Sequence, residues 1–312
     1  MTVNFGLTLN SLKQHKWRFL AILFLIGVGG MYGILPVGRA LLIAYPRRTP
    51  VTGTPGDAGY AYENVTLTTS TGVQLHGWYI ASQHGATILI AHPYTSNRSH
   101  YLEQAIFLAE HGYGVLLFDL AAHGESKGRR VTLDGTDVLA AAAYLEGRAD
   151  TKDDKIGAWG FSLGGMVSLQ AAAQNDHIQA IVADGPFPIV AAEDMPKPKT
   201  LEDWVWLPFD TVQRLSLRIL AIPPARSTIQ ALSQVAPRKV LLVSGSQNSG
   251  EQRVMRHYHN TASGNVILWE VADANHIESW YVAKETYQER VLQLFDTALL
   301  GMHTPRRGRG SE

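Results

Sequence analysis

The chain has 312 residues, of which 46% are hydrophobic and 17% charged, a composition typical of a globular protein with a sizeable apolar core. Lysine plus arginine equal aspartate plus glutamate at 27 each, so no net charge favours nucleic acid as a partner. The absence of cysteine excludes disulfides, thiolate nucleophiles and cysteine-ligated metals.

A long apolar segment predicts a single-pass membrane anchor within the N-terminal region, residues 1–45. Phe19–Gly38 carries no charge, and about 20 apolar residues are enough to span a hydrocarbon core of ~30 Å. Lys16 and Arg18 stand directly before it, which favours a cytoplasmic N-terminus and an extracytoplasmic remainder. A cleaved signal peptide is the alternative, but its apolar core is usually only ~7–15 residues long. Arg39 also falls where a cleavage site would lie.

Residues 46–60 are rich in Pro, Gly and Thr and predict a linker, after which strands and helices alternate over residues 61–301. The expected strands are Tyr62–Thr68, Val73–Ile80, Thr87–Ala91, Gly114–Phe118, Lys155–Trp159, Ile178–Ala183, Lys239–Val243 and Asn265–Val271. The expected helices are Tyr101–His111, Asp134–Leu145, Ser162–Gln174 and Tyr281–Leu299. This alternation predicts an α/β domain, with a mostly parallel twisted sheet and helices on both faces.

Two segments depart from the alternation. Residues 186–236 contain Trp204, Trp206, several prolines and the amphipathic stretch Val212–Ile222. They predict a short helical cap at the carboxyl edge of the sheet, where ligands bind in open α/β sheets. Residues 302–312 form a basic tail that we expect to be disordered.

The strongest motif is Gly160-Phe161-Ser162-Leu163-Gly164, which follows an expected strand and opens an expected helix. A serine on a tight strand-to-helix turn presents its hydroxyl away from the sheet, and the flanking glycines avoid collisions with neighbouring backbone. The strand, turn and helix therefore predict that Ser162 is a nucleophile.

Three further segments make the chain resemble the α/β-hydrolase superfamily over about residues 60–300. Ala91-His92-Pro93-Tyr94 resembles the family's His-Gly-x loop, and Phe118–Ser126 resembles its Asp-x-Arg-Gly-x-Gly-x-Ser segment. The pattern from Tyr62 to Tyr79 is similar to that of membrane-anchored bacterial members with a short cap. The resemblance implies an α/β-hydrolase fold and an acyl-transfer mechanism.

A serine hydroxyl needs an adjacent base at pH 7. The family's chain order places a histidine after the last strand, which here implies His276. His123 is the second candidate, although the family carries a histidine there without a catalytic role. His257 and His259 could suggest a metal, but no third ligand stands near them in the sequence, so we expect a solvated helix face and no metal.

The resemblance also implies an oxyanion hole made by the backbone amides of Tyr94 and Leu163. Pro93 replaces the usual glycine of the loop. Proline has no N–H, but the expected donor is the following residue, Tyr94.

The acid that should orient the histidine is absent from its usual position, which Asn248 occupies. Glu251 on the same loop could reach His276, and we place it first. Asp184 after the preceding strand is the alternative acid. The third possibility is a weakened pair of Ser162 and His276 alone.

These residues predict a serine hydrolase that cleaves a carboxylic ester or related acyl bond through an acyl-enzyme on Ser162, without a cofactor. The expected partners are an apolar small-molecule substrate and the membrane. Because one fold hosts many chemistries, a catalytically weakened or inactive binding module and a serine peptidase stay open as alternatives. The oligomeric state does not follow from these patterns.

Overall fold

The computed structural model describes residues 6–152, 154–186, 194, 197–222, 226–262 and 264–302, with side chains from residue 16 onward. These residues fall into two compact units. One comprises Met1–Ala44 and Lys197–Ala221, and the other comprises Tyr45–Pro196 and Ile222–Glu312. The predicted sheet lies wholly in the second unit.

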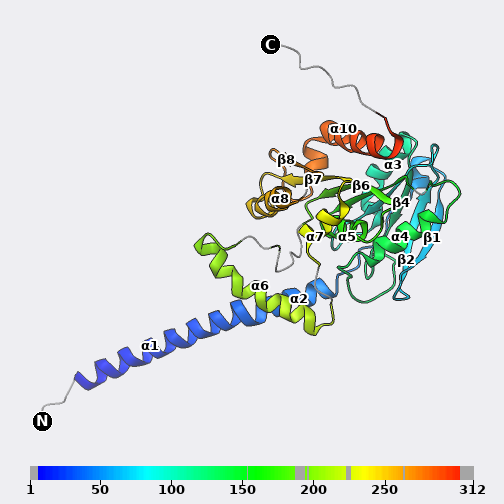
Figure 1. The fold of residues 1–312 in the computed structure, drawn as a ribbon. Coiled ribbons are helices and arrows are strands. Elements are labelled where there is room, and N and C mark those ends of the chain that lie inside the picture. Colours follow the sequence, from blue (N-terminus) through cyan, green and yellow to red (C-terminus); the bar gives the residue numbers. More distant parts are fainter. Residues whose placement is uncertain are drawn as a thin grey trace, which may run out of the picture. The chain divides into compact units, whose positions relative to one another are not determined.

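An eight-stranded sheet in the order β1-β2-β4-β3-β5-β6-β7-β8 forms the centre of the second unit (Figure 1). Its first strands, β1 and β2, form an antiparallel hairpin, β2 pairs antiparallel with β4, and all later neighbours are parallel. The strands are β1 Glu63–Thr68, β2 Gln74–Ile80, β3 Thr87–Ala91, β4 Gly114–Phe118, β5 Ile156–Phe161, β6 Ile178–Asp184, β7 Lys239–Gly245 and β8 Val266–Val271.

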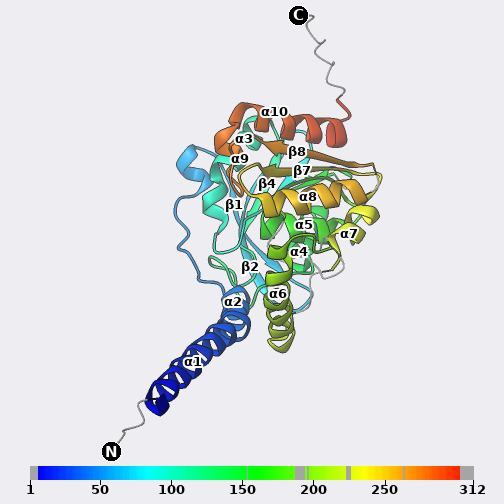
Figure 2. The ribbon, with the colours of Figure 1, turned by 90° about the vertical axis from the view of Figure 1, so that its left-hand side faces the viewer.

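Helices cover both faces of this sheet, as expected (Figures 1 and 2). One face carries α3 Leu102–Glu110, α9 Ser279–Val282 and α10 Lys284–Phe295; the other carries α4 Thr136–Glu146, α5 Leu163–Ala172, α7 Thr228–Val235 and α8 Ser249–Thr261. On the first face an aromatic group including Trp159, Trp280, Tyr287 and Phe295 is fully buried. The central strands β3, β4 and β5 are buried along their whole length, because helices exclude water from both sides of a parallel sheet.

Short helical turns complete the second unit. They are the 3₁₀ turns η2 Pro55–Ala58 and η3 Arg98–Tyr101 and the π turn η5 Asp296–Leu300. The C-terminal segment, expected as one helix over Tyr281–Leu299, is therefore divided into α9, α10 and η5. Ala283, with φ −130° and ψ 46°, leaves helical geometry and separates α9 from α10.

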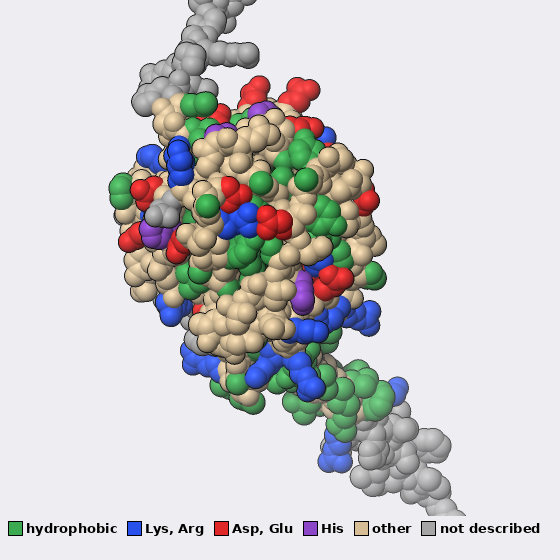
Figure 3. Space-filling model, turned by 90° about the vertical axis from the view of Figure 1, so that its right-hand side faces the viewer, with side chains coloured by type: hydrophobic (Ala, Val, Ile, Leu, Met, Phe, Trp, Pro, Cys, Tyr) green, Lys and Arg blue, Asp and Glu red, His purple; other side chains and the backbone are tan. Residues whose placement is uncertain are grey.

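In the first unit, the N-terminal segment is a continuous helix made of α1 Gly6–Gly29, a π turn η1 Gly30–Ile34 and α2 Leu35–Ala44. The stretch Lys16–Ala44 is long and apolar enough to cross a membrane. Its side chains are mostly exposed, and Figure 3 shows hydrophobic side chains covering it.

The same unit contains part of the predicted cap, the helix α6 Leu201–Ile219. It begins at a capping box, in which the Thr200 hydroxyl accepts from the Asp203 amide and the Asp203 carboxylate accepts from the Thr200 amide. α6 packs beside α2. The helix begins well before the expected amphipathic stretch Val212–Ile222, because Thr200 is its N-cap, and it ends at Ile219, before the end of that stretch.

Candidate functional site

Ser162 lies on a sharp turn between β5 and α5. Its backbone has φ 51° and ψ −111°, a conformation that non-glycine residues adopt only where the surroundings impose it. The glycines around it allow close approach. A Cβ on Gly160 would lie 2.3 Å from the Gly164 carbonyl oxygen, and one on Gly164 would lie 2.0 Å from the Ala91 carbonyl oxygen. The turn thus packs directly against the end of β3, as the motif requires.

His276 joins Ser162 to an acid. It lies on the loop between β8 and α9, and its Nε2 is 2.8 Å from Ser162 Oγ. Its Nδ1 is 2.5 Å from Glu251 Oε2 at the start of α8. Loops at the carboxyl ends of parallel strands meet at one edge of the sheet. This edge brings together three residues that the sequence separates by up to 114 positions.

Helix capping holds Glu251 in this position. The Asn248 side chain is the N-cap of α8 and accepts a hydrogen bond of 3.1 Å from the Glu251 amide. The other carboxylate oxygen of Glu251 accepts from the Gly245 amide at 3.3 Å, and the side chain is fully buried. Asn248, in the position where the family usually has its acid, therefore places the helix that carries Glu251.

Asp184 lies close to the site with different partners. It ends β6, is fully buried, and accepts a hydrogen bond of 3.0 Å from the Tyr287 hydroxyl. Its second oxygen has no hydrogen-bond partner within the described residues. Burial raises the pKa of Asp184 to about 7, and the Glu251 charge acts in the same direction.

Opposing effects set the basicity of His276. Burial lowers the pKa of the imidazole, while the hydrogen bond and charge of Glu251, with the charge of Asp184, raise it. The raising effects prevail, so the pKa lies above its ordinary value of 6.5.

The expected oxyanion donors belong to α5 and to the loop after β3, two segments next to the Ser162 turn. Leu163 is the first residue of α5, where backbone amides have no acceptor within the helix. Tyr94 follows β3 in the loop that begins at His92. The His92 ring fixes this loop, because its Nδ1–H donates to the Pro93 carbonyl at 2.7 Å and its Nε2 accepts from the Leu120 amide at 3.0 Å.

His123 supports the same loop rather than Ser162. Its ring packs edge-on against His92 and Tyr94, with centroids 5.1 and 5.6 Å apart, and its Nδ1–H donates to the Ala121 carbonyl. Burial, with the neighbouring His92, lowers its pKa to about 3. Its Nε2 has no hydrogen-bond partner within the described residues, so the structure does not bring this second candidate base into contact with Ser162.

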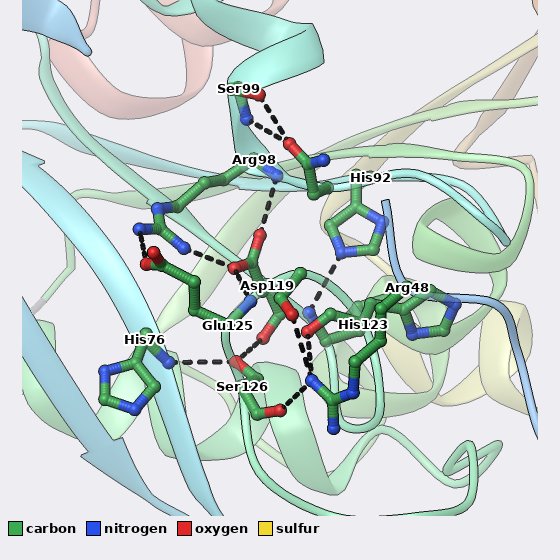
Figure 4. A network of polar contacts seen from close by, with 12 residues as sticks. Arg48, His76, His92, Arg98, Ser99, Asp119, His123, Glu125 and Ser126 are labelled. Carbon is green, nitrogen blue, oxygen red and sulfur yellow. Dashed lines mark hydrogen bonds and ion pairs between the residues drawn. The ribbon is translucent and has the colours of Figure 1, made fainter. Parts of the chain in front are cut away.

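A polar network fixes the loop that carries His123 (Figure 4). Asp119 binds the Arg98 guanidinium and accepts from the amides of Arg98 and Glu125 at 2.8 and 2.9 Å. Arg48, just after the N-terminal helix, donates to four carbonyl oxygens of this loop, those of His123, Gly124, Ser126 and Gly128. Arg48 thereby joins the linker by hydrogen bonds to the loop whose His123 ring packs against Tyr94. The contacts of Asp119 with Arg98 and of Arg48 with this loop are not visible in a local sequence pattern, since 21 to 80 residues separate these partners.

Two glycines near His276 are further site residues that the sequence patterns do not single out. Gly185 has φ 55°, and a Cβ there would lie 2.8 Å from the His276 ring. A Cβ on Gly245 would lie 2.3 Å from the Asn275 carbonyl, next to His276. In the part of the chain with described side chains, no group of three metal-ligating residues occurs. His257 and His259 lie on α8, where His257 is 3.4 Å from the Thr261 hydroxyl.

The family model described as "alpha/beta hydrolase fold" matches residues 86–232. The α/β hydrolase domain-containing protein WAV2 of Arabidopsis thaliana is 27% identical, over 86% of this chain and 92% of its own length. A crystal structure of the Pyrococcus furiosus esterase Pf2001 superimposes with a TM-score of 0.64 at 27% identity, covering 82% of this chain and 99% of the esterase. The polyketide transferase ATR5 of Stachybotrys chlorohalonatus is 28% identical over 40% of this chain and 44% of its own length. These matches confirm the expected fold.

Proposed function

Since this chain belongs to the α/β-hydrolase superfamily, we propose that it is a serine hydrolase that cleaves an ester or related acyl bond. The observation that carries the proposal is the unbroken series of contacts from Ser162 through His276 to Glu251. Nucleophile, base and orienting acid in this order form the arrangement that activates a serine hydroxyl. The esterase likeness supports the same reaction class.

In the proposed mechanism, Ser162 Oγ attacks the acyl carbon while His276 Nε2 takes its proton. The charge of Glu251 stabilises the imidazolium that forms and keeps the ring in the tautomer with Nδ1–H. The amides of Leu163 and Tyr94 bind the oxyanion of the tetrahedral intermediate. His276 then protonates the leaving group, which departs and leaves the acyl-enzyme on Ser162. Water next attacks the acyl carbon while His276 Nε2 takes its proton, and His276 returns the proton to Ser162 Oγ as the acyl group is released. The substrate is a small apolar acyl compound.

We also propose that Lys16–Ala44 anchors the protein in a membrane as an uncleaved helix, with the hydrolase unit outside the cytoplasm. The length and apolar surface of this helix support the anchor. Lys16 and Arg18 at its start support the orientation.

A fluorophosphonate probe tests the proposed nucleophile. The folded full-length protein is expected to be labelled, and peptide mass mapping should place the adduct on Ser162. Heat-denatured protein is the control, since labelling needs the hydrogen bond from Ser162 to His276. A folded protein that takes up no probe would contradict the hydrolase and support an inactive binding module. Aminoacyl amides assayed beside p-nitrophenyl esters separate a peptidase from an esterase.

The pH dependence of kcat/KM follows from the raised pKa of His276. The base must be neutral to accept the serine proton, so activity is lost as the pH falls through this pKa. We expect the acidic limb of the pH profile to have its midpoint above 6.5 in the wild type. In Glu251→Gln the hydrogen bond to a charged partner is gone, so the midpoint should move to lower pH. A midpoint that is the same in both proteins would contradict the pairing of His276 with Glu251.

A further inference from the structure

Exposed apolar side chains are concentrated in the unit that contains the N-terminal helix. Among the described residues, the large hydrophobic side chains exposed in the other unit are Tyr45, Ile267, Tyr281, Val282 and Met302. All remaining ones lie on the N-terminal helix or on α6. Water-exposed apolar surface on this scale marks a contact with another apolar phase. For the N-terminal helix this phase is the proposed membrane. α6 likewise exposes large hydrophobic side chains.

Three faces of different chemistry run along α6. Successive residues of an α-helix are turned by ~100°, which places one apolar stripe at Leu201, Trp204, Val205, Pro208, Val212, Leu215 and Ile219. Its ends are strongly exposed, with Leu201 at 81% and Ile219 at 77%. A second face is buried and comprises Phe209, Gln213, Ser216 and Leu217. The third carries the charges of Asp203, Asp210, Arg214 and Arg218. The buried face already packs α6 within the protein, so the exposed apolar stripe is not needed for that packing and is a separate surface.

The contacts between α6 and α2 give the depth of this surface along the anchor. Lys16–Ala44 has 29 residues and is therefore roughly 43 Å long, more than the ~30 Å of a hydrocarbon core. The uncharged run Phe19–Gly38 fills that core, so the residues from Arg39 onward reach the headgroup region. The Arg39 guanidinium lies 5.9 Å from the centroid of the Phe209 ring and also faces Asp210. α6 packs mainly against α2 and also contacts η1, so it lies beside the end of the anchor, from the outer part of the uncharged run to the headgroup region.

We propose that α6 is a second membrane-binding element, an interfacial helix whose stripe Leu201–Ile219 enters the boundary between headgroups and acyl chains beside the anchor. Trp204 on this stripe is 61% exposed, and tryptophan is a residue that favours this depth. The charged face keeps the helix from sinking further, as in other interfacial helices. The inference rests on the proposed membrane anchor and is independent of the hydrolase chemistry.

Site-specific labelling of the full-length protein tests this inference, since the natural chain has no cysteine and one introduced cysteine is labelled uniquely. Ile219→Cys reports on the stripe, and the adjacent Arg218→Cys, also exposed, is the matched control on the charged face. Leu25→Cys reports on the anchor and Ile267→Cys on the hydrolase unit; both positions are exposed. Each protein carries an environment-sensitive fluorophore and is reconstituted into phosphatidylcholine vesicles with or without doxyl groups on the acyl chains.

Doxyl lipids are expected to quench the labels at Leu25 and Ile219 severalfold more than those at Arg218 and Ile267. If the label at Leu25 is quenched but the label at Ile219 is quenched no more than that at Ile267, the interfacial helix is overturned and the anchor stands. Equal quenching at Ile219 and Arg218 would also overturn it, because the helix would then be fully immersed. No quenching at Leu25 would refute the anchor itself, and the inference with it.

Discussion

Ser162→Ala is expected to lower kcat for ester hydrolysis by roughly 10⁶-fold, the scale of loss when the serine or histidine of such a site is removed. The hydroxyl is the atom that attacks, and its hydrogen bond to His276 is the only route by which its proton leaves in the proposed mechanism. His276→Ala should cost about as much, since the Ser162 hydroxyl alone is a poor nucleophile at neutral pH. Initial rates with a p-nitrophenyl ester, corrected for spontaneous hydrolysis, measure both effects.

The double variant makes this prediction sharper. Residues that act as a unit lose their combined contribution when either is removed, so Ser162→Ala with His276→Ala should be no slower than either single variant. Ser233→Ala, an exposed serine on α7, is the matched control and should retain the wild-type rate. A Ser162→Ala enzyme within about tenfold of the wild type would contradict the acyl-enzyme.

Local patterns in the sequence predict the parts of the site that neighbouring residues determine. The turn at Ser162 requires small residues at fixed distances along the chain, and Gly160 and Gly164 provide the clearances found in the structure. The alternation of apolar strands and helices is also a local pattern, and it predicts the sheet. His276 lies beside Ser162, as its place after the last strand implies, because parallel strands end at one edge.

The parts that depend on distant contacts or on helix boundaries did not follow from the sequence. The sequence places Glu251 before Asp184 as the acid, but whether Glu251 reaches His276 depends on the residue at which α8 begins. The structure starts this helix at the Asn248 cap, so that Glu251 is in its first turn. Gly185 is required by the imidazole ring of His276, and Arg48 binds a loop 75 to 80 residues away. No periodicity encodes either contact.

Glu251→Gln is expected to lower kcat by ~10²–10⁴-fold, while Asp184→Asn should cost less than about tenfold. Glu251 accepts from His276 Nδ1 at 2.5 Å, which leaves Nε2 free to accept the serine proton. A glutamine amide can instead donate to Nδ1, and the imidazole then carries its proton on Nε2, where it cannot act as a base. Asp184 binds the Tyr287 hydroxyl, and with a pKa of about 7 it is already partly neutral at neutral pH. An asparagine oxygen can still accept from Tyr287.

Asn248 supplies the control for this comparison. Asn248→Asp keeps a capping oxygen for the Glu251 amide and should retain most of the activity, whereas Asn248→Ala should cost about 1 kcal/mol of stability through the lost cap. Thermal unfolding and kcat measured on the same preparations separate the two effects. If Asp184→Asn proves the slower enzyme, the acid role passes to Asp184. If both acid variants stay within about tenfold of the wild type, His276 works without an orienting carboxylate. The geometry speaks against both of these contrary outcomes, because the one carboxylate bonded to the imidazole within the described residues is that of Glu251.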